Sequence, residues 1–335
     1  MEEIGMNKKA MISIATVLVL AIAGFFVYKS MTAVKVADVN LTEQQQKISE
    51  YKHPESIITP EELNALLVDG KEDIVVIGTM KSADQVIDGS YVVWRDNYSG
   101  TDAFPYGGMI NTKEELEAML SEFGVNQDTT IVTYAANDQH DSARLFWTFK
   151  VLGHENVRLL DGGMNAWLGA GFEAGAVAKA GDRPATEYKA ADYNVAKYDA
   201  SLDMVKQAVG NDDYIILDTR SESEETGADT KKGAFGPGKI KGATFLEYKI
   251  ATKENGTFKT KAELEEIYKD VLSSDKEVIA YCQSGVRSAY TWFVLTQILG
   301  YEDVLNYDGS WIEWSYYGYD QKDASVKDLT ENGKF

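Results

Sequence analysis

The stretch "VIAYCQSGVRSAYTW", residues 278–292, holds Cys282, which is the only cysteine of the 335-residue chain. The residues before Cys282 have the apolar character of a short buried strand, and those after Gly285 have the pattern of a helix. Strands that alternate with helices form parallel α/β sheets, and such sheets bind ligands at the carboxyl ends of their strands. Cys282 is therefore predicted to lie at a ligand-binding edge.

The chemistry of this position favours a reactive thiol. A tight loop that leads into a helix points several backbone N–H groups inward at the positive end of the helix dipole, and this arrangement stabilises an anion. The thiol is expected to have a pKa below its usual value of about 8.5 and to be nucleophilic near neutral pH. A lone cysteine is also commonly a small buried hydrophobic residue, and its position alone leaves that alternative open. The nearby Gly285 and Arg287 favour the reactive thiol, because they suit an unusual backbone angle and a negative charge.

The segments around Cys282 repeat an earlier part of the chain, 147 positions before. The matching pairs are Tyr134 and Tyr281, Phe146 and Phe293, Gly153 and Gly300, Asp161 and Asp308, Gly162 and Gly309, and Trp167 and Trp314. Each copy contains a strand, a loop, a helix that ends at glycine, a further short strand and a turn that begins with Asp-Gly. This order predicts an α/β fold with two tandem domains, each a mainly parallel sheet flanked by helices.

Several of these motifs together resemble the rhodanese, or thiosulfate sulfurtransferase, superfamily. The segment "VIAYCQSGVRSA" resembles its active-site loop, and "VLNYDGSWIEW" (304–314) is similar to the C-terminal signature of its two-domain members. Three further segments look like recurring segments of the family, namely "LDTRSESE" (217–224), "GKIKGA" (238–243) and "NGTFKTKAEL" (255–264). The resemblance runs from about residue 57 to residue 314 and implies two rhodanese-like domains.

The resemblance implies a mechanism of sulfur transfer. Cys282 would attack the outer sulfur of thiosulfate or a related donor such as mercaptopyruvate, and would keep that sulfur as a persulfide. A thiol, cyanide or sulfite acceptor would then remove it, without a metal or an organic cofactor. The family also implies which residues bind the substrate and the persulfide through the loop: Gln283, Ser284, Gly285, Val286 and Arg287.

Two other functions remain possible from the sequence. Phosphatase and arsenate-reductase relatives of the same fold place five residues between cysteine and arginine, whereas four lie between Cys282 and Arg287. The shorter loop favours a pocket for a single sulfur atom. The other alternative is a rhodanese module without catalytic activity that binds a partner or senses sulfur species.

Residues outside the loop are interpreted by the same resemblance. Asp218 and Arg220 resemble a family pair that supports the active loop. Arg287 is expected either to bind the donor anion or to lock the loop by pairing with a carboxylate. Glu224 stands where the vertebrate-type enzymes are expected to carry an arginine, which leaves the identity of the donor open.

The first copy lacks the residues that this mechanism needs. Ala135 stands at the position of Cys282 and His140 at that of Arg287, while Gly78 and Met80 replace Asp218 and Arg220. The first domain is therefore predicted to be an inactive rhodanese-like domain that helps to form the wall of the cleft. His140 is interpreted as a surface loop residue.

Charge and the N-terminal segment bear on partners and location. The formal net charge of −20 argues against nucleic-acid binding. Residues 10–28 form an uncharged run, which as a helix spans roughly 28 Å, close to a bilayer core of about 30 Å. We expect one N-terminal transmembrane helix that anchors the protein in the cell membrane with its domains outside the cytoplasm. A cleaved signal peptide, which would make the protein secreted, is the alternative.

The predicted organisation has six segments. They are an anchor or signal segment at 1–30, a stalk at 31–54, the inactive domain at 55–175, a linker at 176–195, the catalytic domain at 196–320 and a polar tail at 321–335.

Overall fold

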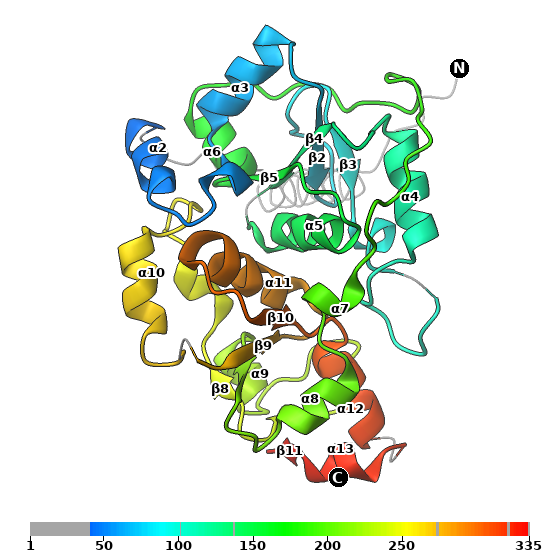
Figure 1. The fold of residues 1–335 in the computed structure, drawn as a ribbon, viewed down its shortest axis with the longest axis vertical. Coiled ribbons are helices and arrows are strands. Elements are labelled where there is room, and N and C mark those ends of the chain that lie inside the picture. Colours follow the sequence, from blue (N-terminus) through cyan, green and yellow to red (C-terminus); the bar gives the residue numbers. More distant parts are fainter. Residues whose placement is uncertain (1–40, 101, 137, 273–274, 320–321, 334–335) are drawn as a thin grey trace, which may run out of the picture. The chain divides into compact units, whose positions relative to one another are not determined.

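The computed structural model describes residues 41–335, apart from positions 101, 137, 273–274, 320–321 and 334–335. The first domain is built on a five-stranded parallel sheet in the order β1–β5–β4–β2–β3 (Figure 1). Its strands are β1 (Ile57–Ile58), β2 (Ile74–Thr79), β3 (Tyr91–Val93), β4 (Thr130–Ala135) and β5 (Val157–Leu160). The central strands β2 and β4 are almost wholly buried, as expected for parallel strands covered by helices.

Threonine caps fix where two helices of the first domain begin. Thr59 Oγ1 accepts a hydrogen bond from the Glu62 N–H at 3.2 Å, and the Glu62 carboxylate accepts one from the Thr59 N–H at 3.0 Å. This capping box starts α3, and a second capping box at Thr112 starts α4 in the same way. The helical elements are α3 (Pro60–Asp69), α4 (Lys113–Glu122), α5 (His140–Val151), α6 (Gly163–Gly169) and the short 3-10 turns η1 (Pro54–Ser56) and η2 (Arg95–Asn97).

The second domain repeats this architecture with a four-stranded parallel sheet in the order β10–β9–β6–β8. Its strands are β6 (Tyr214–Asp218), β8 (Thr244–Phe245), β9 (Glu277–Tyr281) and β10 (Val304–Asn306). The helical elements before the C-terminal segment are α7 (Val195–Tyr198), α8 (Leu202–Ala208), α9 (Glu222–Glu225), η3 (Tyr248–Ala251), α10 (Lys261–Tyr268), α11 (Val286–Phe293), the π-helical η4 (Val294–Leu299) and α12 (Ser310–Tyr319). The predicted α/β class with parallel sheets flanked by helices is confirmed.

The two domains share one hydrophobic core. Helices α5 and α11 lie side by side (Figure 1), and the rings of Phe146 and Phe293 meet edge to face with centroids 4.8 Å apart. These two phenylalanines occupy matching positions of the sequence repeat. Buried residues of both domains, including Trp147 and Trp292, belong to the same cluster.

Two aspartates at matching positions connect the domains in a reciprocal way. Asp161 of the first domain accepts a hydrogen bond from the Phe258 N–H of the second at 2.9 Å. Asp308 of the second domain accepts one from the Ile110 N–H of the first at 2.7 Å. Each aspartate also pairs with a cation, Asp161 with Lys47 at 2.7 Å and Asp308 with Arg144. All four side chains are at most 5% exposed, and loss of one partner of such a buried pair costs about 3–5 kcal/mol.

Both ends of the described chain differ from the expected stalk and tail. Part of the predicted stalk forms helix α2 (Leu41–Ser49), which contacts the first domain through the Lys47 ion pair. Part of the predicted tail forms α13 (Ala324–Asp328) and β11 (Thr330–Glu331), and β11 pairs antiparallel with β7 (Lys239–Ile240). The reason is burial, since Val326 is fully enclosed and Thr330 Oγ1 accepts a hydrogen bond from Trp314 Nε1 at 2.9 Å.

The predicted membrane anchor at residues 10–28 lies outside the described residues. Among the helices from residue 41 onward that the structure describes, none combines the length and the apolar character needed to cross a bilayer.

Candidate active site

Cys282 lies directly after β9, at the carboxyl edge of the second sheet. Its side chain is buried, with 1% of its surface exposed. The hydroxyl of Ser288, in the first turn of α11, donates to Cys282 Sγ over 3.5 Å. The thiol therefore has the position that the sequence predicts, and it is enclosed by the loop that follows it.

Burial and the surrounding donors act on this thiol in opposite directions. Burial by itself raises the pKa of Cys282, because it disfavours the charged thiolate. The positive charge of Arg287, the Ser288 hydroxyl and the backbone N–H groups of Ser288 and Ser284 lower this pKa, and together they outweigh burial. The pKa of the thiol lies below its ordinary value, which favours the nucleophilic thiolate.

Gly285 gives the loop its tight turn. Its φ of +72° lies in the left-handed region, and it stands directly before the first residue of α11. A Cβ atom here would come within 2.6 Å of Asp308 Oδ1 and 2.7 Å of Arg144 Nη1. Both the backbone angle and the lack of space therefore require glycine.

The Asp-Gly-Ser-Trp turn clamps the active loop from the other side. Ser310 Oγ accepts hydrogen bonds from the Cys282 N–H at 3.1 Å and from the Gly285 N–H at 3.0 Å, and donates to the Tyr307 carbonyl at 2.7 Å. The N–H groups of Trp311 and Ile312 donate to the carbonyls of Cys282 and Gln283, each at 3.0 Å. Residues 304–314, which resemble the C-terminal signature of the two-domain members, are therefore part of the site, because they fix the backbone of the loop that carries the thiol.

The clamp occupies one of the backbone N–H groups of the loop. The Gly285 N–H donates to Ser310, whereas the N–H groups of Ser284 and of Ser288, which the sequence reasoning did not include, act on the thiol. Gln283 is buried, and its amide nitrogen has no hydrogen-bond partner among the described residues. The Val286 side chain is 3% exposed and has no polar atom, so only its backbone can bind an anion.

Arg287 forms a fork with Glu224. Its two terminal nitrogens lie 2.7 and 2.8 Å from the two carboxylate oxygens of Glu224, which is 1% exposed. Burial by itself raises the pKa of Glu224. The pairing with Arg287 and the hydrogen bonds from Ser221 have the larger, opposite effect and lower this pKa to about 2. Of the two expected states of Arg287, the structure has the pair with a carboxylate. The partner is Glu224, the residue at which the sequence departs from the vertebrate-type pattern.

Asp218 and Arg220 form a second buried pair behind the loop. Arg220 Nε lies 2.9 Å from Asp218 Oδ1, and Nη2 lies 2.6 Å from Oδ2. The guanidinium lies over the rings of Tyr281 and Trp311, with its Cζ 5.4 and 4.9 Å from their centroids. Tyr281 precedes Cys282, and the Trp311 N–H binds the Cys282 carbonyl, so the pair contacts both neighbours of the loop.

The first domain places an ionic cluster at the matching edge of its own sheet. Ala135 ends β4, so a methyl group replaces the thiol there. His140 begins α5 and lies in the cluster with only 17% of its side chain exposed, which corrects its interpretation as a surface loop residue. His140 Nδ1 lies 2.7 Å from Asp138 Oδ1, and Nε2 lies 3.3 Å from Asp141 Oδ2. Burial lowers the pKa of His140, but the two carboxylates raise it above its ordinary value.

Sequence reasoning missed Arg95, which completes this cluster. Arg95 Nε donates to Asp141 Oδ1 at 2.8 Å, and its Nη2 lies 3.3 Å from His140 Nε2. No sequence motif marks Arg95. Its position shortly after β3, at the carboxyl edge of the first sheet, was the one feature that could have indicated a site residue. Gly78 lies in β2, and Met80 directly follows that strand. Gly78 leaves room for the ring of Tyr134, which a Cβ atom would approach to 2.8 Å.

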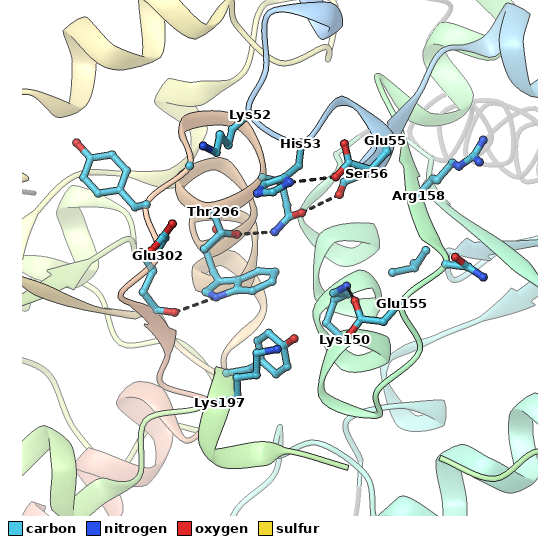
Figure 2. A pocket seen from close by; sticks show the side chains of 18 of the residues that line it. Lys52, His53, Glu55, Ser56, Lys150, Glu155, Arg158, Lys197, Thr296 and Glu302 are labelled. Carbon is cyan, nitrogen blue, oxygen red and sulfur yellow. Dashed lines mark hydrogen bonds and ion pairs between the residues drawn. The ribbon is translucent and has the colours of Figure 1, made fainter. Parts of the chain in front are cut away.

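A cavity of about 570 Å³ lies at the opposite edge of the sheets from Cys282, where β4, β5 and β10 begin. Figure 2 shows that charged side chains of both signs line it. Several of them pair within the cavity, including Lys150 with Glu155 and His53 with Glu55. Its lining does not include Cys282, so it is separate from the thiol site.

Comparison with known proteins identifies the family. The rhodanese-like domain model matches twice, at residues 59–170 and 201–316. A putative thiosulfate sulfurtransferase of Saccharopolyspora erythraea is 38% identical over 209 residues, which cover 60% of this chain and 73% of the relative. The putative thiosulfate sulfurtransferase SseA of Mycobacterium tuberculosis is 32% identical over 282 residues, covering 80% of this chain and 90% of that protein. The thiosulfate sulfurtransferase of Corynebacterium glutamicum is 32% identical over 289 residues, with 79% and 89% covered.

A solved structure has the same fold. The Tum1 protein from Saccharomyces cerevisiae superposes with a TM-score of 0.72 and 23% identity, over 83% of this chain and 99% of that one. The relatives confirm the predicted class of enzyme, a rhodanese-type sulfurtransferase. The two matched domains identify the family. The chain belongs to the rhodanese family and carries two rhodanese-like domains in tandem.

Proposed function

We propose that this protein moves sulfane sulfur from thiosulfate, or a related anionic donor, to a thiophilic acceptor through a persulfide on Cys282. The observation that carries the proposal is the enclosed thiol with a lowered pKa, surrounded by the Arg287 charge, the Ser288 hydroxyl and inward N–H groups. Thiolate character is what a cysteine nucleophile requires, and a site that stabilises an anionic sulfur suits a persulfide equally well.

The first half-reaction breaks the S–S bond of the donor. The Cys282 thiolate attacks the outer sulfur of thiosulfate, the new Cys–S bond forms, and the electron pair of the broken bond leaves with sulfite. The product is an anionic persulfide on Cys282. In the second half-reaction cyanide, sulfite or a thiolate attacks the outer sulfur of the persulfide, and the electron pair returns to the Cys282 thiolate. Charge balances in both steps, and neither involves a metal or an organic cofactor.

The surrounding residues have distinct roles in this proposal. The N–H groups of Ser284 and Ser288 stabilise the anionic sulfur in the manner of an oxyanion hole. Arg287 contributes charge while Glu224 holds it in place. Ser310 and the Asp218–Arg220 pair act indirectly, because they fix the backbone and the aromatic rings that position the loop.

Steady-state kinetics test this proposal. Thiocyanate formation from thiosulfate and cyanide should give the parallel double-reciprocal lines of a two-step exchange, and Cys282→Ser should abolish it. Ser223→Ala, which changes an exposed serine, is the matched control. Intersecting lines would contradict a covalent intermediate. Full activity of Cys282→Ser would exclude the assigned nucleophile.

A further inference from the structure

In the second domain, the arginines nearest to the active loop are already paired with carboxylates. Both terminal nitrogens of Arg287 are bound by Glu224, and Arg220 is buried against Asp218 and the Gly238 carbonyl. Lys231, in the segment between α9 and β7, pairs with Asp229, and Lys239, the first residue of β7, pairs with Glu225 at 2.5 Å. An anionic sulfur donor would therefore gain from a further cation that is held near the active loop and remains accessible.

Arg95 of the first domain has the required accessibility. It lies in η2, just after the carboxyl end of β3, and 37% of its side chain is exposed. Asp141 holds Nε at 2.8 Å and Nη2 at 3.2 Å, while Nη1 makes no hydrogen bond within the described part of the chain. The guanidinium carbon lies 5.1 Å from the centroid of the Trp94 ring, which limits its movement. The side chain is therefore held in place and still offers donors.

Two contacts place this part of the first domain against the active loop. Arg144, one helical turn after Asp141 on α5, donates to the Gly285 carbonyl at 3.3 Å, and one turn advances a helix by about 5.4 Å. Gly108 is so close to the loop that a Cβ atom on it would lie 2.7 Å from Ser284 Cβ. Burial lowers the pKa of Arg95, but the hydrogen bonds and the charge of Asp141 outweigh it, and the charge of Cys282 makes only a small contribution in the same direction.

The carboxylates beside Arg95 have partners of their own. Asp138 pairs with His140 Nδ1 and accepts a hydrogen bond from the Tyr248 hydroxyl at 3.0 Å. Asp141 binds Arg95 itself, lies 3.3 Å from His140 Nε2 and accepts a long hydrogen bond from the Tyr98 hydroxyl at 3.4 Å. The negative charges of Asp138 and Asp141 are thus balanced by His140 and Arg95. The Nη1 atom of Arg95 remains available to an incoming anion.

We propose that the catalytically silent domain supplies the anion-binding element of the active site, with Arg95 recognising the charged group of the sulfur donor. This inference rests on the proposed sulfur transfer and adds a specificity-determining residue to it. Arg95 receives the sulfonate of thiosulfate, or the carboxylate of a similar donor, while the terminal sulfur points to Cys282. An uncharged thiol reagent gains nothing from this contact.

A pair of sulfur reagents separates recognition of the anion from reactivity of the thiol. Methyl methanethiosulfonate is neutral and contains an S–SO₂ bond like that of thiosulfate. The Cys282 thiolate attacks its sulfenyl sulfur, a methyl disulfide forms on Cys282, and methanesulfinate leaves. Because Cys282 is the only cysteine, labelling of the full chain reports on this thiol alone.

We expect Arg95→Gln to raise the KM for thiosulfate about tenfold, because a charge-assisted contact is lost, with little change in kcat. The rate of labelling by methyl methanethiosulfonate should stay within about twofold of the wild-type rate, which shows that the loop is intact. Lys81→Gln is the matched control, since Lys81 also lies over the Trp94 ring, at 5.2 Å, and should leave both values unchanged. Arg95→Lys should be intermediate.

Equal losses with both reagents would overturn the inference, because they would mean that Arg95 acts only through the fold. An unchanged KM in Arg95→Gln, or an equal rise in Lys81→Gln, would also overturn it.

Protection by sulfate keeps the test independent of turnover. Sulfate should slow labelling of the wild type by methyl methanethiosulfonate, and this protection should be lost in Arg95→Gln. If wild type takes no sulfur from thiosulfate, the proposed function fails, and the sulfate experiment still decides the role of Arg95: protection that is absent in wild type, or equal in both proteins, refutes it.

Discussion

At the scale of single residues, the reactivity of Cys282 depends on a charge that another residue holds in place. Arg287 is the strongest of the groups that lower the pKa of this thiol, and Glu224 binds both of its terminal nitrogens. Glu224 stands where an arginine was expected, and it positions the cation Arg287 beside the thiol.

Removal of the Arg287 charge should weaken the thiolate. In the double variant Arg287→Gln/Glu224→Gln, which avoids an unpaired buried carboxylate, we expect the pKa of Cys282 to rise, because the charge that most lowers it is gone. A thiolate is then present only at higher pH, so alkylation by iodoacetamide near pH 7 should slow about tenfold. The pH profile of the alkylation rate measures this shift. Lys241→Gln, a change at an exposed lysine, is the control. An unshifted profile in the double variant would contradict the assigned effect of Arg287.

At the scale of elements, the N-terminal end of α12, which begins at Ser310, and the loop before α11 form one unit. Ser310 accepts hydrogen bonds from two N–H groups of the loop, and no other side chain connects both sides of the thiol in this way among the described residues. The position of the thiol therefore depends on a turn that lies 28 residues further along the chain.

Ser310→Ala should loosen the loop and destabilise the second domain. Two buried N–H groups lose their acceptor, which costs about 1–3 kcal/mol each unless the loop rearranges. We expect a lower free energy of unfolding in urea and a loss of transferase activity that exceeds the loss of folded protein. Ser325→Ala, which removes an exposed hydroxyl bound to Asp323, is the control. Wild-type activity and stability in Ser310→Ala would show that the clamp is dispensable.

The sequence was most informative where local pattern and motif agree. Strands β2, β4, β6 and β9, the capped helix at Thr59 and the position of Cys282 were predictable, because buried Val and Ile runs, capping residues and the loop motif are local signals. Arg95 and the partner of Arg287 were not predictable, since each depends on a contact between segments far apart in sequence. Helix α2 and strand β11 were missed for the same reason: their polar segments become ordered through partners such as Asp161 and β7.

At the scale of the whole molecule, the described domains are coupled by a common core and by exchanged aspartate contacts. Lys47→Met should leave Asp161 buried without its cation, at a cost of about 3–5 kcal/mol. Because Asp161 also binds the Phe258 N–H, we expect the variant to lower the urea concentration at which Cys282, in the other domain, becomes accessible to a thiol reagent.

Lys71→Met is the control for this experiment, since Lys71 forms an exposed pair with Asp69. Circular dichroism and thiol accessibility should give coincident transitions in wild type and in Lys47→Met. A shift in circular dichroism with an unchanged midpoint for Cys282 would mean that the domains unfold independently.

We propose that residues 10–28 anchor this molecule in a membrane. After cell fractionation the full chain should be found with the membranes and should resist extraction by high salt, because a helix of this length and composition inserts by burial of apolar surface. A chain without residues 1–35 should be found in the soluble fraction. Recovery of the full chain in the soluble fraction at its full mass would contradict an anchor, and recovery at a lower mass would support a cleaved signal segment instead.

The most direct test of the account is the intact mass of the protein after incubation with thiosulfate. We predict a gain of one sulfur atom, about 32 Da, that is absent in Cys282→Ser and disappears when cyanide is added, as expected of a covalent intermediate. A wild-type chain that gains no sulfur from thiosulfate or mercaptopyruvate, while its thiol still reacts with methyl methanethiosulfonate, would contradict persulfide chemistry at Cys282.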